Sequence, residues 1–294
     1  MAENSNLSSP SNGTQKSDWN YYEWCMGYST ALVIWSTVSA FCFLLGFPAS
    51  LWVLHELIQR QRQRSTSDVL MLSLAGVDLL FTAQIPICIF NFMIWHISYL
   101  QRALIFVYSF NFIGRPLFLG GICWDCYVAV VHPIVYKTRK KFVVVKKVIT
   151  MVVFCIMFMF GSLVCQMPRL ITTPLMSSPL MVVLPVIAFC DISILLALRK
   201  PDPTGKNEIH PQKKQALHTI FNSLIMTLII YLPPMLIFSL GTWLFGERET
   251  YCCSAPYGFS FSTVGCVIIP VRYLISVGKL DALKNLWQKR TLDS

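Results

Sequence analysis

Seven apolar runs dominate this sequence, and each is long enough to cross the hydrocarbon core of a bilayer. That core is about 30 Å thick, so a helix that rises about 1.5 Å per residue needs about 20 apolar residues to span it. Charged residues make up only 13% of the chain and the mean hydropathy is +0.57, which excludes an ordinary soluble globular protein. We predict an all-α fold, a bundle of seven transmembrane helices. The runs cover residues 29–57, 67–94, 100–131, 142–167, 179–198, 215–244 and 254–277.

Basic residues between the runs predict the orientation of the chain. Seven spans put the two termini on opposite sides of the membrane. Of the 24 lysines and arginines, 18 lie in segments on the side of the C-terminus and four on the other side. The positive-inside rule then predicts an extracellular N-terminus in a multi-pass plasma-membrane protein. Because the basic residues are spread over every inner loop, we attribute the net charge of +10 to topology and anionic membrane lipids, and expect no nucleic-acid partner.

The ends of the chain differ from the apolar middle, so we expect three regions. Residues 1–28 form a polar tail that lacks the features of a cleavable signal peptide and carries glycosylation sequons at Asn6 and Asn12. Residues 29–277 form the transmembrane bundle. In residues 278–294, apolar side chains recur at helical spacing among basic ones, which predicts a short amphipathic helix on the inner membrane surface and a cytoplasmic tail.

Three of the 11 cysteines lie at the predicted outer face. Cys25 precedes the first span, and Cys252 and Cys253 precede the seventh. The extracellular compartment is oxidising, so a disulfide from Cys25 to Cys252 or to Cys253 is expected. The other cysteines fall mostly within spans, where a small buried apolar role is expected.

Motifs in several spans resemble one receptor family. Residues 74–78 read Leu-Ala-Gly-Val-Asp, and residues 111–133 carry Asp125-Cys-Tyr and His132-Pro. Proline marks recur as Pro185, as Tyr231-Leu-Pro233 and as Pro270-Val-Arg-Tyr273. Together these residues resemble the rhodopsin-like (class A) G-protein-coupled receptors, nearest the branch of nucleotide, protease-activated and lipid receptors, over residues 29–290. The chain departs from the pattern at enough positions to be a divergent member.

Two charges inside the membrane are expected to pair. Asp78 and Arg115 each cost about 2.5–3.5 kcal/mol if unpaired at the bilayer centre. The resemblance makes their positions neighbours and puts Asp78 at the family's sodium-binding carboxylate, with Arg115 where the cation would bind. We expect an ion pair between helices and no sodium modulation. The alternative is that Arg115 snorkels or faces a water-filled cavity.

The inner end of the third span departs from the family pattern. The family has Asp-Arg-Tyr, whose arginine restrains the resting state and receives the G protein; here the residues are Asp125-Cys126-Tyr127. A thiol has neither the fixed charge nor the five donors of a guanidinium. The resemblance assigns the remaining switch positions to Tyr231, Pro233, Pro270 and Tyr273.

The outer half is also unusual, because Gln101 stands where the family has a disulfide cysteine. Carried over by position, the pocket-facing residues are aromatic or apolar, with no group to pair a charged ligand. They are Tyr108, Phe112, Met235, Phe238, Phe259 and Thr263. A small apolar or lipid-like ligand suits such a pocket. The alternative is that these side chains only pack the core.

Three functions follow from these features. The leading hypothesis is an orphan-type receptor that transmits the binding of an extracellular ligand to a heterotrimeric G protein. The second is a receptor-derived decoy or heteromer partner without signalling, because the switch arginine is missing. A transporter or channel could also use Asp78 and Arg115, but the sequence has no internal repeat of the kind transporters show. The five histidines lack metal-ligand spacing, and we expect no enzyme activity, cofactor or metal.

Overall fold

The computed structural model describes residues 25, 27, 29–63, 69–132, 139–167, 170, 173–199 and 211–276. The predicted glycosylation sites Asn6 and Asn12 and the predicted amphipathic helix at 278–294 lie outside these residues. Within them, every regular element is helical, which confirms the all-α fold. The α-helices are α2 (Ser29–Gln63), α3 (Val69–Phe90), α4 (Ser98–Ser109), α5 (Arg115–Val131), α7 (Arg139–Gln166), α8 (Pro174–Arg199), α9 (Pro211–Phe245), α10 (Glu247–Glu249) and α11 (Ala255–Ser276). Three π-helical turns join them: η1 (Asn91–Trp95), η2 (Phe110–Gly114) and η4 (Thr250–Ser254).

Each of the seven predicted spans corresponds to a long helical segment. In the described part of the chain, six segments are long and apolar enough to cross a membrane by length and composition. The seventh is the 35-residue helix α9, whose apolar stretch Thr227–Gly241 is shorter. Helices are the expected elements because a bilayer offers no water to satisfy exposed backbone groups, and a helix satisfies them internally.

Three differences between the observed and the predicted helix bounds stand out. α2 continues beyond residue 57 to Gln63, where Arg60 pairs with Glu56 one turn earlier at 3.2 Å. α8 begins at Pro174 rather than 179, so the preceding loop is shorter than predicted. The third span is interrupted by η2, which widens the helix for one turn directly before Arg115. Such π turns often occur at functional sites.

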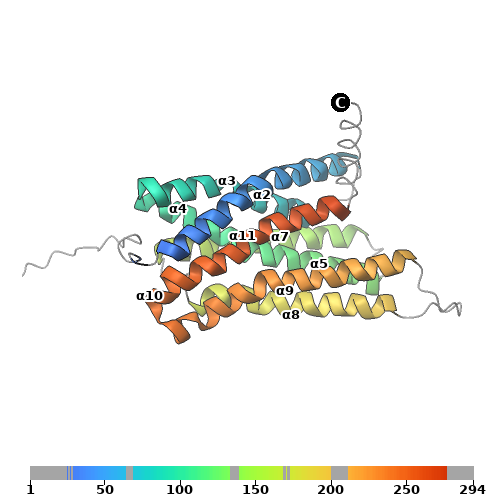
Figure 1. Ribbon diagram of the computed structural model, residues 1–294. Coiled ribbons are helices and arrows are strands. Elements are labelled where there is room, and N and C mark those ends of the chain that lie inside the picture. Colours follow the sequence, from blue (N-terminus) through green and yellow to red (C-terminus); the bar gives the residue numbers. More distant parts are fainter. Residues whose placement is uncertain are drawn as a thin grey trace, which may run out of the picture.

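The helices form a closed bundle (Figure 1). α2 packs against α3 on one side and against α11 on the other, so the first and last helices of the described chain are neighbours. α8 packs against α5 and α9, and α9 packs in turn against α11. α4 contacts α3 and α7, while α5 contacts α3 and α8, so the third span touches both halves of the bundle.

A disulfide connects the segment before α2 to the turn before α11. Cys25 and Cys252 are bonded, with their Cα atoms 5.3 Å apart and a sequence separation of 227. Both residues are buried. Cys253 is partly exposed and has a free thiol. The bond therefore uses the first of the two alternatives that the sequence left open.

Removing this disulfide is expected to destabilise the protein. Cys252→Ser should lower the free energy of unfolding by about 2–5 kcal/mol, because the bond constrains the unfolded chain. The measurement is thermal unfolding of the full chain in lipid nanodiscs. The matched control, Cys253→Ser, should unfold like the wild type. Equal losses in the two variants would contradict a bond that uses Cys252 alone.

Candidate functional site

Arg115 has the largest fully buried side chain among the described residues. It is the first residue of α5, directly after the π turn η2, and its side chain is fully buried. Pro116 follows it in the first turn of α5, where a missing backbone N–H costs little because the wide turn already alters the hydrogen bonding. A buried guanidinium needs partners because its desolvation is costly.

Asp78 on α3 supplies the negative charge. Its Oδ1 lies 3.3 Å from Nε of Arg115, and the two side chains are 2% and 0% exposed. The atoms are at ion-pair distance, but their alignment does not meet the criteria for a hydrogen bond, and Nη2 makes none within the described residues. The attraction is therefore mainly electrostatic. Asp78 also lines a small cavity of about 30 Å³ that reaches Ser50 and Tyr273.

The rest of the guanidinium is held by α11. Nη1 of Arg115 donates to the backbone carbonyl oxygen of Ser262 at 3.1 Å and contacts Sγ of Cys266 at 3.0 Å. Asn111 in η2 reinforces the same junction, because its Nδ2 donates to Oγ of Ser262 at 3.2 Å and its Oδ1 lies 3.4 Å from Sγ of Cys266. Arg115 thus binds α3 and α11 to the third span.

Gly265 makes room for this contact. A Cβ atom at Gly265 would lie 2.9 Å from Nη1 of Arg115 and 3.0 Å from Cγ2 of Ile230. The sequence analysis identified Asp78 as the expected partner of Arg115. The contacts with Ser262 and Gly265 have no signal in the sequence, since they depend on a backbone oxygen and on a missing side chain. The contact with the Cys266 thiol depends on how α11 is rotated toward Arg115.

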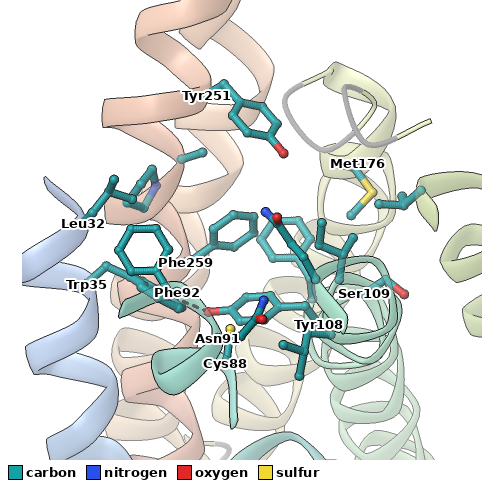
Figure 2. Close-up of a pocket in the computed structure, with 17 residues that line it drawn as sticks. Leu32, Trp35, Cys88, Asn91, Phe92, Tyr108, Ser109, Met176, Tyr251 and Phe259 are labelled. Atoms are coloured by element: carbon teal, nitrogen blue, oxygen red, sulfur yellow. Dashed lines mark hydrogen bonds between the residues drawn. The ribbon is translucent and has the colours of Figure 1, made fainter. Parts of the chain in front are cut away.

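An apolar cavity of about 110 Å³ lies further along the bundle. Figure 2 shows labelled side chains around this cavity, with the rings of Trp35, Phe92, Tyr108, Tyr251 and Phe259 among them. The 17 lining residues are Leu32, Trp35, Cys88, Asn91, Phe92, Gln101, Leu104, Ile105, Tyr108, Ser109, Phe112, Val164, Met176, Tyr251, Ala255, Pro256 and Phe259.

Tyr108 connects three helices beside the cavity. Its hydroxyl accepts a hydrogen bond from Nε1 of Trp35 on α2 at 3.3 Å and lies 3.1 Å from Oγ1 of Thr263 on α11. Thr263 donates in turn to the carbonyl oxygen of Phe259 at 2.8 Å, so Tyr108 is the donor to Thr263. Since Thr263 follows Ser262 directly, the side chains at the cavity and the partners of Arg115 lie on the same turn of α11.

The structure divides the six predicted pocket residues into two groups. Tyr108, Phe112 and Phe259 line the cavity. Phe238 is fully buried with its ring centroid 5.0 Å from that of Phe112 and 5.2 Å from that of Phe259. Thr263 is likewise fully buried, and Met235 packs against the same core. Gln101, which the sequence analysis noted only as a missing disulfide cysteine, is part of the wall.

The predicted switch residues Asp125, Cys126 and Tyr127 lie at the end of α5. Asp125 and Tyr127 contact side chains of neighbouring elements. Oδ2 of Asp125 is 2.8 Å from Nζ of Lys146 on α7. Cys126 is exposed. The ring of Tyr127 contacts those of Trp124, His132 and Phe189, with centroids 5.5 to 5.8 Å apart.

The remaining switch positions lie inside α9 and α11. Tyr231 is 2% exposed, and its hydroxyl makes no hydrogen bond within the described residues. Pro233 and Pro270 lie within α9 and α11, where each removes a backbone donor and permits a bend. Tyr273 packs against a cluster that includes Val53, Leu57 and Leu274.

Comparison with known proteins identifies the family. The family model described as "7 transmembrane receptor (rhodopsin family)" matches residues 49–271. The chain is 33% identical over 107 residues to the C-X-C chemokine receptor type 1 of Rattus norvegicus, an alignment that covers 36% of this chain and 31% of that relative. The aligned part therefore spans about a third of the relative's length, and the expected nearness to the nucleotide, protease-activated and lipid branch stays a prediction. Given the extent of the family match, the chain belongs to the rhodopsin family of seven-transmembrane receptors.

Proposed function

We propose that this chain is a plasma-membrane receptor with an extracellular N-terminus, which binds a small apolar or lipid-like ligand in the cavity beside Tyr108 and signals to a heterotrimeric G protein. The observation that carries this proposal is the connection between the cavity and Arg115. Tyr108 lines the cavity and bonds to Thr263, while Ser262 in the same turn of α11 bonds to Arg115.

Through this connection, ligand binding in the cavity can change the position of helices in the inner half of the bundle. A ligand that moves Tyr108 changes the hydrogen bonds that hold α2 and α11 to the third span. Arg115 joins the same turn of α11 to Asp78 on α3. A shift of α11 therefore alters the position of Pro270 and Tyr273 further along that helix. A transmitted signal requires such an element with two arrangements.

A second candidate function is a receptor-derived decoy or heteromer partner that does not signal. The observation that favours it is the inner end of α5, where Cys126 replaces the family's arginine and Asp125 pairs with Lys146 of the neighbouring helix. In this arrangement the carboxylate is engaged by α7, and no guanidinium stands beside it in sequence.

Replacing Cys126 with arginine distinguishes the two functions. The receptor proposal expects ligand-driven nucleotide exchange on at least one G-protein subtype by the wild-type protein, and about tenfold more by Cys126→Arg, the equivalent of one charge-assisted hydrogen bond of about 1.5 kcal/mol. The assay compares purified G-protein subtypes at equal surface expression of the receptor.

Cys126→Lys is the matched control, because it adds the charge without the planar fork of donors. It should stay near the wild-type rate. If only Cys126→Arg promoted nucleotide exchange, the result would favour the non-signalling function. The wild-type protein would then be a receptor scaffold that lacks the switch residue. No exchange by any of the three proteins would contradict coupling to G proteins.

A further inference from the structure

The wall of the cavity is uncharged. None of its 17 residues is a lysine, arginine, histidine, aspartate or glutamate. Arg102 follows Gln101 in α4, but it is not part of the wall, and its guanidinium lies 5.9 Å from the ring centroid of Tyr99. A carboxylate, phosphate or ammonium group inside the cavity would lose its hydration without gaining a counterion. The wall therefore selects a ligand whose buried part is neutral.

Three polar side chains of the wall are held by the protein itself. Asn91 exchanges hydrogen bonds with the backbone of Ile97, accepting from its N–H at 3.0 Å and donating to its carbonyl oxygen at 3.4 Å. Ser109 donates to the carbonyl oxygen of Phe106 at 2.6 Å. The Tyr108 hydroxyl has both Trp35 and Thr263 as partners. These groups stabilise the bundle and leave little capacity for a ligand.

Gln101 differs from these three. It is half-buried in the first turn of α4, and its backbone N–H donates to the carbonyl oxygen of Ile97 at 3.0 Å. Its side-chain amide makes no hydrogen bond to any residue that the structure describes. One donor group and one acceptor oxygen are thus available at the wall.

The position of Gln101 also determines how long the apolar part of a bound ligand can be. Tyr108 lies seven residues further along the helix, which corresponds to about 10 Å along its axis. The rings of Tyr108 and Phe259 meet edge to face, with centroids 4.8 Å apart, and Phe112 lies a further turn along. A polar group at Gln101 therefore leaves a stretch of about 10 Å along aromatic and aliphatic side chains for an apolar chain.

We propose that Gln101 determines the ligand specificity of this cavity, by hydrogen bonding the uncharged polar head of a lipid such as a fatty amide or a fatty alcohol while the alkyl chain lies against Tyr108, Phe112 and Phe259. This inference rests on the proposed ligand-binding function of the cavity. The amide of Gln101 both donates and accepts, which matches an amide or hydroxyl head and gives no advantage to a carboxylate or an amine.

Four probes with the same ten-carbon chain test the head-group preference. Decanamide and 1-decanol are neutral, whereas decanoate and decylamine carry a charge at pH 7. The dissociation constants follow from the melting temperature of the full chain in nanodiscs as a function of probe concentration. We expect the neutral probes to bind at least tenfold more tightly than the charged ones, and Gln101→Met to weaken decanamide binding by about tenfold, the loss of one or two hydrogen bonds.

Gln59→Met is the matched control, because Gln59 is an exposed glutamine on α2 that bonds to His55 and does not line the cavity. It should bind all four probes like the wild type. Equal or tighter binding of decanoate or decylamine in the wild type would overturn the inference. An unchanged affinity of Gln101→Met for decanamide would do the same.

A variant that fills the cavity separates this inference from the proposed function. Ala255→Phe places a ring at a wall position that is 2% exposed, and Leu104→Trp is an independent second variant at the opposite helix. If a filled cavity abolishes decanamide binding but Gln101→Met does not weaken it, the cavity binds ligand and only the role of Gln101 is wrong. If neither filled variant that retains the wild-type fold changes the binding, the probes bind elsewhere and both proposals fail.

Discussion

Arg115→Met is expected to lower the free energy of unfolding by about 3–5 kcal/mol, because it leaves the carboxylate of Asp78 buried and without its countercharge. The carboxylate lies 3.3 Å from the guanidinium, and both side chains are almost inaccessible to solvent. Asp78→Asn is expected to cost less, since Arg115 keeps the Ser262 carbonyl oxygen and Cys266 as partners. Chemical or thermal unfolding in nanodiscs and surface expression both measure the loss.

The double variant, Asp78→Asn with Arg115→Met, should recover much of the loss, because neither position then buries a charge. A double-mutant cycle separates the pairing energy from the effect of each substitution. The charge-exchanged pair, Asp78→Arg with Arg115→Asp, should recover less. An arginine on α3 does not follow the η2 turn, which positions the Arg115 side chain against Ser262. Additive losses in the cycle would contradict an energetic coupling between the two side chains.

Arg102→Met provides the matched control for the arginine substitution. Arg102 lies on the same span but contacts the ring of Tyr99 near the start of α4. Its replacement should cost less than that of Arg115, because Arg102 is half-buried whereas the side chain of Arg115 is fully buried. A similar loss for the two arginines would mean that general effects of the substitution, and not the ion pair, determine the result.

Gly265→Ala is the second substitution with a large expected effect. The added methyl group would lie 2.9 Å from Nη1 of Arg115 and 3.0 Å from Ile230, so it should displace the guanidinium and cost about 1–3 kcal/mol. Gly76→Ala is the control on α3, where an added Cβ meets nothing within 4 Å. That change should be neutral or stabilise the helix by about 0.5–1 kcal/mol, because alanine is the better helix former.

The Arg115→Met background identifies the cause of the Gly265 effect. A methionine lacks the guanidinium that the methyl group would meet and can adapt its flexible chain. The cost of Gly265→Ala should therefore fall in that background. If the cost stayed the same, the contact with Ile230 rather than Arg115 would be responsible. A stabilising effect of Gly265→Ala in the wild-type chain would contradict the close packing altogether.

The transmembrane helices and the need for a charge pair follow from the sequence. Apolar runs of this length have a single stable solution in a bilayer, because only a helix satisfies every backbone group within one segment. The same cost of exposed polar groups in lipid predicts that Asp78 and Arg115 require partners. The structure places the two at ion-pair distance. Local physical rules suffice for these features, since each depends on the residue type and its depth in the membrane.

The contacts that complete the site depend on the register of neighbouring helices. The η2 turn changes the direction in which Arg115 and the residues after it point from the third span. No residue type in Phe110–Gly114 specifies a π turn. The same limit applies to the cavity, where Phe238 and Thr263 are fully buried without lining it and Gln101 forms part of its wall. The rotation of each helix about its axis decides which of these side chains faces the space.

The sequence by itself thus predicted seven membrane-spanning helices and the need of Asp78 and Arg115 for partners, while its resemblance to the receptor family predicted that the two residues pair with each other. Only the tertiary structure decided that Arg115 also bonds to the Ser262 carbonyl oxygen on α11 through the gap left by Gly265, and that Cys25 bonds to Cys252. The physical reason is that every residue carries a backbone oxygen and every glycine lacks a side chain, so neither feature marks a contact site in a sequence. Their meaning arises when another helix brings a partner to within about 3 Å, the distance of a hydrogen bond.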